Sequence, residues 1–219
     1  MPPNTPEYRA QLIREGRHAE LFQAFQEMLE TTPDDPSLLH NVSLSAYRSG
    51  QFAEAANYLR QLKAQVPQDF KVRAKLVQVY EALQNFSDRD AERDELLALY
   101  SQQKADRNTP DRYCRDEFTV GDRAVQAFEY FELVGDVAKR YTFYIFRAGE
   151  QKPEYFISLG SYAATNQYMR QRGTLQPDER IFHLDEYRAG GAHRSLSFYK
   201  GEPPYNVVKS AVQDILRQT

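Results

Sequence analysis

The first half of the chain repeats with a period of 34 residues. Three pairs of identical residues are 34 positions apart: Gly16 and Gly50, Pro33 and Pro67, and Phe52 and Phe86. A period of this length is typical of stacked supersecondary units, each of which buries its apolar face against the next. The repeat therefore restricts the chain up to about residue 100 to an array of similar units.

The clearest unit runs from about Pro36 to Asp69. Apolar residues at helical spacing predict one helix before the turn Ser49-Gly50-Gln51 and a second helix after it, and these residues are Leu39, Val42 and Ala46, then Phe52, Ala55, Leu59 and Leu62. The second helix is expected to end before Pro67. Each unit is therefore predicted to be an antiparallel pair of amphipathic helices.

The period, the turn glycine, the alanine five residues after it and the closing proline resemble the tetratricopeptide repeat (TPR), over residues 7 to about 100. The resemblance implies a stack of helix pairs with a groove that binds peptides or proteins. The first unit has Leu21 where the packing alanine is expected. The third replaces the turn glycine with Gln84-Asn85, where asparagine is the residue expected to tolerate a left-handed backbone.

In this family the first helix of each unit lines the groove. The resemblance therefore implies a partner-binding surface made of His40, Asn41, Leu44, Tyr47, Arg48, Lys71, Lys75 and Gln78. Pro6 and Ala10 stand where members that clamp a terminal carboxylate have lysine and asparagine, so we expect no such clamp. Lysine and arginine in the groove could still meet an acidic segment. The alternative is that these residues form ordinary solvated helix faces.

A polar segment at 101–111 separates this half from one rich in aromatic residues, so we predict two domains, 1–105 and 106–219. Apolar stretches between turn signals predict strands at 113–120, 123–133, 139–147, 154–159, 180–188 and 192–200. One helix is expected after Ser161 as its cap, and another along 205–216. The predicted fold class is two-domain α+β, with all-α helical-hairpin repeats followed by an antiparallel sheet of about six strands with two helices.

The strand at 139–147 is apolar on both sides. Tyr141, Phe143 and Ile145 alternate with Thr142, Tyr144 and Phe146. Helices that cover one face of the sheet would leave aromatic surface on the other, which monomers seldom expose. The repeat domain, a second copy in a homodimer or an apolar ligand would each cover that surface, and we favour the repeat domain, which would also cover the end of a short repeat stack.

Residues that suggest catalysis are few. His183 and Asp185 share a strand face, which is the one arrangement able to orient a general base. If Gly190-Gly191 form a two-residue loop, Asp185 lies diagonal to Arg194, and we predict that it pairs with Arg194 and not with His183. An enzymatic or small-ligand role for the second domain is the alternative function, with His183, Asp185, Arg194 and Cys114 as its candidate residues.

The composition of the chain argues against several classes of function. The chain has 28 Lys and Arg against 31 Asp and Glu, a net charge of −3, so no basic excess suggests a nucleic-acid partner. The apolar runs are too short to span a membrane, and the first residues do not resemble a signal peptide, so we expect a cytoplasmic protein. Cys114 is the single cysteine, and no metal-ligand spacing or glycine-rich phosphate loop is present, so no metal or cofactor is expected. The sequence predicts a non-enzymatic adaptor that binds a protein or peptide.

Overall fold

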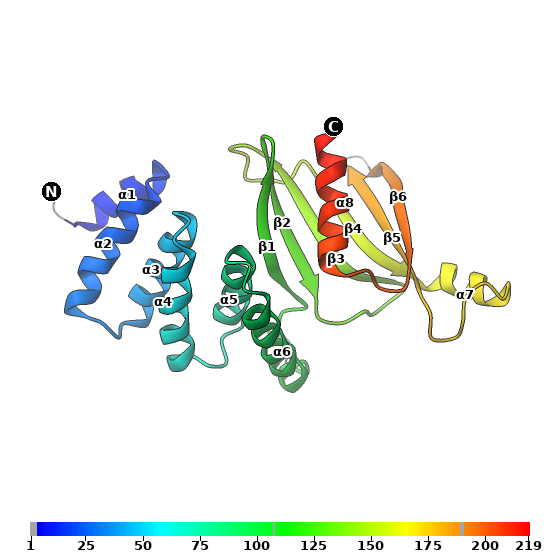
Figure 1. Cartoon of the computed structure of the whole chain (residues 1–219), viewed down its shortest axis with the longest axis horizontal. Helices are drawn as coiled ribbons and strands as arrows, with labels where there is room; N and C mark the ends of the chain where they lie inside the picture. The colour runs from blue at the N-terminus through cyan, green and yellow to red at the C-terminus, as the bar shows by residue number, and fades with distance from the viewer. Residues whose placement is uncertain (1–3, 107, 189–190) are drawn as a thin grey trace. The chain divides into compact units, whose positions relative to one another are not determined.

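The computed structural model describes residues 4–106, 108–188 and 191–219. The chain divides into two compact units, Met1–Arg107 and Asn108–Thr219 (Figure 1). The first unit contains helices, and the second contains a six-stranded antiparallel sheet with two helices. The predicted fold class is confirmed.

The helices of the first unit form three antiparallel hairpins: α1 (Pro6–Arg14) with α2 (His18–Thr31), α3 (Pro36–Arg48) with α4 (Phe52–Gln65), and α5 (Phe70–Ala82) with α6 (Phe86–Gln103). Each hairpin begins with a side-chain cap, because Thr5, Asp35 and Asp69 accept hydrogen bonds from backbone N–H groups of the first turn. The caps Asp35 and Asp69 are 34 residues apart. The 34-residue period therefore also includes the residues that cap α3 and α5.

The turn inside each hairpin has a left-handed residue at the same place in the period. Gly16 has φ +68°, Gly50 has φ +80° and Gln84 has φ +56°. In the third hairpin the left-handed residue is thus Gln84 and not Asn85. Asn85 instead caps α6, where its side-chain oxygen accepts a hydrogen bond from the backbone N–H of Asp88 at 3.3 Å.

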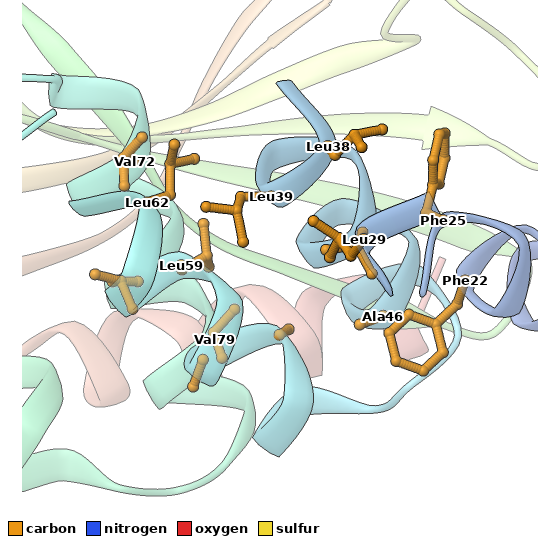
Figure 2. Close-up of a cluster of buried hydrophobic side chains, with 14 of the residues drawn as sticks. Phe22, Phe25, Leu29, Leu38, Leu39, Ala46, Leu59, Leu62, Val72 and Val79 are labelled. Carbon is orange, nitrogen blue, oxygen red and sulfur yellow. The ribbon is translucent and has the colours of Figure 1, made fainter. Parts of the chain in front are cut away.

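Side chains from α1 to α5 form the core of the first unit (Figure 2). Leu39, Leu59 and Leu76, from three successive helices of this stack, are each 1% exposed or less. Leu21, which stands where Ala55 does in the next unit, is also buried, at 3% exposed. The larger side chain is therefore accommodated, and the first hairpin still pairs its helices.

A network of four charged side chains joins the last three helices of this unit. Lys63 on α4 lies 2.6 Å from Glu92 and 2.7 Å from Glu95, both on α6. Arg73 on α5 lies 3.0 Å from Glu92 and 2.5 Å from Glu95. Glu92 is only 6% exposed, so its two cations compensate a buried carboxylate.

The strands of the second unit are β1 (Arg112–Val120), β2 (Arg123–Tyr130), β3 (Val137–Arg147), β4 (Tyr155–Tyr162), β5 (Ile181–Arg188) and β6 (His193–Lys200). Their order in the sheet is β1-β2-β3-β4-β5-β6, and every neighbouring pair is antiparallel. The sheet is therefore a meander of all six strands.

Helix α8 (Tyr205–Arg217) covers one face of this sheet (Figure 1). Its Val208 and Val212 are fully buried against strand residues such as Phe143. Asp116 on β1 fixes the start of the helix, because it accepts hydrogen bonds from the Tyr205 hydroxyl at 2.9 Å and the Lys209 ammonium at 2.7 Å.

Helix α7 (Ala163–Gln171) begins after the predicted cap. Strand β4 continues to Tyr162, so Ser161 belongs to the strand and does not cap the helix. Its hydroxyl instead accepts a hydrogen bond from the buried Asn166 side-chain amide at 2.7 Å. The same Asn166 side chain accepts from the Ile181 backbone N–H at 2.8 Å, so Asn166 ties α7 to β4 and β5.

The register of β5 and β6 differs from that of a two-residue loop. Tyr187 is opposite His193 and Asp185 is opposite Ser195, with a bulge next to Asp185. The predicted loop would have placed Tyr187 opposite Arg194. Of the two glycines in that prediction, Gly190 lies outside the described residues.

Candidate functional site

The predicted binding residues of the clearest unit lie on one stripe of α3. His40 and Arg48 are exposed, and Asn41, Leu44 and Tyr47 are partly exposed. The other side of the helix contributes Leu38, Leu39, Val42 and Ala46 to the core. The stripe is therefore available for contact while the opposite side of α3 holds the hairpins together.

Helix α5 carries the remaining three predicted residues. Lys71 is exposed, Lys75 is partly exposed and Gln78 is buried at 3% exposed. The ammonium of Lys75 donates a hydrogen bond to the side-chain oxygen of Gln78 and lies 4.6 Å from the centroid of the Tyr47 ring. This cation–π contact joins the first helices of two successive hairpins. Gln78 thus positions Lys75, which in turn contacts Tyr47.

Charge is divided between the first and second helices of the hairpins. Helices α1, α3 and α5 carry six Lys and Arg residues against two Asp and Glu, whereas α2, α4 and α6 carry four against nine. The positive charge of Arg48 on α3 also acts on His18 at the start of α2: burial, and then this charge, lower the pKa of His18 below its ordinary value. The predicted binding stripe therefore lies on the electropositive set of helices.

In the second unit, Asp185 is the centre of a hydrogen-bonded group on the sheet face opposite α8. It is 1% exposed and accepts from the hydroxyls of Tyr162 at 2.5 Å and Ser195 at 2.7 Å. His193 Nε2 lies 3.5 Å from the same carboxylate, and the hydroxyls of Tyr162 and Tyr187 are 2.8 Å apart. Burial, then hydrogen bonding to Asp185, raises the pKa of the Tyr162 phenol, which stays protonated as a donor.

The predicted pair between Asp185 and Arg194 is wrong. Arg194 instead lies 3.0 Å from Glu186, because the register between the turn and the bulge places it opposite that residue. Burial acts against ionisation of Glu186, but Arg188 and Arg194 hold the pKa of its carboxyl below the ordinary value. Asp185 and Arg194 therefore belong to opposite faces of the sheet.

The four residues of the enzymatic alternative do not form one site. Within the described residues no hydrogen bond joins His183 to Asp185, and the His183 ring instead packs 5.0 Å from Tyr162 and 5.9 Å from Phe198. Cys114 is on β1, and three strands separate it from β5, a distance of about 19 Å across the sheet. Asp185 is bonded instead to the hydroxyls of Tyr162 and Ser195.

Sequence reasoning missed Tyr162 and Ser195 as partners of Asp185. Tyr162 was expected inside a helix, and only the continuation of β4 brings its hydroxyl over β5. Ser195 faces Asp185 because the register between the turn and the bulge differs by one residue from the predicted one. The one available signal was Asp185 itself, a charged residue on the same strand face as His183 and Tyr187.

Across 4–106, 108–188 and 191–219, no three His, Cys, Asp or Glu side chains gather closely enough to hold a metal ion. None of the helices within those same ranges has the length and apolar character needed to cross a membrane. No protein-family model and no curated protein matches the chain.

Proposed function

We propose that the chain is a non-enzymatic adaptor whose three hairpins are tetratricopeptide repeats and bind a protein segment along their first helices. The observation that carries the proposal is the contact between Tyr47 and Lys75, which links two first helices next to the exposed Arg48 and Lys71. Tyrosine and arginine dominate binding energy at many protein interfaces. The second unit would act as a further interaction module, and the single cysteine suits a reducing compartment such as the cytoplasm.

The binding stripe combines side chains of different character. Leu44 and the Tyr47 ring provide apolar contact area, whereas His40 and Asn41 provide hydrogen-bonding groups. Of this stripe only Tyr47 packs against the core, because the buried apolar residues of α3 lie on its other side. A protein segment in extended or helical form has the mixed apolar and polar surface that such a stripe fits.

The test compares two matched pairs of substitutions. Tyr47→Ala with Arg48→Ala should reduce capture of the partner by the full chain at least about tenfold, because each removes a contact of the type found at hot spots. Tyr58→Ala with Arg60→Ala makes the same chemical change on α4, where Tyr58 packs against the same core as Tyr47. This control pair should leave capture unchanged.

The helical circular dichroism signal of both double variants should match that of the unchanged chain. Equal capture by the Tyr47/Arg48 variant and the unchanged chain would contradict the proposed surface. Equal loss in both double variants would show that capture depends on the stability of the hairpin and not on the stripe.

A further inference from the structure

The four central strands, β2 to β5, place very few charges on the sheet face opposite α8, and the edge strands add Arg112, Glu117 and Lys200 at its rim. The residues that β2 to β5 place on it are Ala124, Gln126, Phe128, Tyr130, Val137, Lys139, Thr142, Tyr144, Phe146, Phe156, Ser158, Gly160, Tyr162, Ile181, His183, Asp185 and Tyr187. Only Lys139 and Asp185 among them are charged, and Asp185 is buried and bonded to two hydroxyls. Charged residues make up 27% of the chain, so this face is not a typical solvated surface.

A row of aromatic rings crosses this face from strand to strand. Tyr144 lies 5.9 Å from Phe156, Phe156 stacks on Tyr187 at 4.8 Å, and Tyr187 lies 5.0 Å from His193 at the edge strand. Tyr144, Phe156 and Tyr187 are partly exposed. Phe198 on β6, which belongs to the same face, is 68% exposed.

The helices of this unit leave the ring row open. Helix α8 packs on the opposite face, where Tyr205 contacts the rings of Tyr141 and Phe143. In the described part of the chain, no hydrogen bond or ring contact joins α7 or α8 to Tyr144, Phe156 or Tyr187. The rings therefore lack a covering layer from their own unit.

The size of the face matches that of one side of a stable protein interface. Six strands at a spacing of about 4.8 Å, each about eight residues long, give a face of about 750 Å². A standard interface buries about 800 Å² on each partner. Sheet faces also pack on one another directly, about 10 Å apart, in β-sandwiches.

We propose that two copies of the chain associate through this face as a symmetric dimer. The centre of this face has so few charges that it lacks the charge pattern that would select a different kind of partner, and the charges at its edge strands suit the polar rim of an interface. A second copy brings an identical ring row, so each face supplies the apolar layer that the other lacks. Two-fold symmetry closes the contact at two copies and prevents further growth. This proposal concerns the second unit and does not depend on the partner of the helical hairpins.

The first test uses the unchanged chain. Sedimentation velocity should give a species of twice 25.5 kDa at micromolar concentration and monomer on dilution. Hydroxyl-radical labelling of Tyr144, Phe156 and Tyr187 should increase over the same dilution range. Monomer at every concentration would overturn the proposal. Rings protected in the monomer would show that another part of the same chain covers the face, and rings labelled freely in a dimer would place the interface elsewhere.

The second test uses matched substitutions. Phe156→Asp puts a charge in the centre of the ring row and should weaken dimerisation by at least about 100-fold, since a buried unpaired charge is costly. Val207→Asp introduces the same charge on α8, where Val207 is 43% exposed, and should leave the dimer intact. A Phe156→Asp chain that keeps both its fold and the dimer would also overturn the proposal. If that variant does not fold, the labelling experiment on the unchanged chain decides.

Discussion

Gln84 has a backbone conformation that side chains with a Cβ atom rarely adopt. Its φ of +56° lies in the left-handed region, where Gly16 and Gly50 stand in the other two hairpins. The left-handed region costs an ordinary residue roughly 1–2 kcal/mol. The third hairpin therefore contains a strained residue in its turn. Asn85 stabilises the start of α6 next to it, because its side chain accepts a hydrogen bond from the Asp88 backbone N–H and donates one to the Asp88 carboxylate.

Replacing Gln84 by glycine should stabilise the first unit by about 0.5–1 kcal/mol, because relief of the strain exceeds the extra entropy of glycine in the unfolded chain. Urea unfolding measures this difference. Gly50→Gln is the reverse change at the equivalent position and should destabilise the unit by a similar amount. A Gln84→Gly variant less stable than the unchanged chain would contradict the account of the turn.

His18 makes the first unit sensitive to mild acid. Burial and then the Arg48 charge lower its pKa below 6.5, so the folded state binds its proton less readily than the unfolded state does. The contribution of neutral His18 to stability is present above pH 6.5 and is lost as the pH falls through the folded pKa. Between pH 7.5 and 5, the melting temperature of the His18→Asn variant should therefore fall by less than that of the unchanged chain. Equal losses would show that other groups dominate this range.

The hydrogen-bond partners of Asp185 could not be predicted from the sequence, although its strand face could. Its place on a strand face with His183 could be predicted from the period of two residues in a strand. Its pairing could not, because from Asp185 to Tyr187 the register differs by one residue from that of the predicted loop and brings Ser195 where that loop places Leu196. The bulge between Leu184 and Asp185 restores the predicted register further along, and nothing in the local sequence indicates either change.

Whole helices and strands were easier to predict than single pairings. The turns at Gly16 and Gly50 and the prolines of the repeat delimit helices, because these residues interrupt helical hydrogen bonding or supply a left-handed backbone. The proposed binding residues on α3 are exposed or partly exposed, whereas Gln78 on α5 is buried. Burial of a polar residue depends on tertiary neighbours that helical periodicity does not specify.

The four-charge network makes a prediction at the level of helix packing. Glu92→Gln should destabilise the first unit by about 2 kcal/mol, because Lys63 and Arg73 then lose a buried charged partner. Glu95→Gln is the matched control, since Glu95 contacts the same two cations but is 55% exposed. It should cost less than about 1 kcal/mol. Urea unfolding that gives equal losses would contradict the role of burial.

The molecule as a whole has two separate apolar cores, one in each unit. A stack of three hairpins is close to the smallest number that buries enough surface to be stable. Residues 1–105 expressed alone should therefore melt at a lower temperature than the helical part of the full chain. Calorimetry of both proteins measures the difference, and identical melting would show that the hairpins need no support.

The order of the strands also has a consequence for how the second unit reaches its fold. Each strand pairs with the next one along the chain, and only Gly121-Asp122 separates β1 from β2. Loops this short close at little entropic cost, and local pairings speed folding. The sheet can form hairpin by hairpin, without waiting for distant segments to meet, and should refold quickly for an antiparallel sheet of its size.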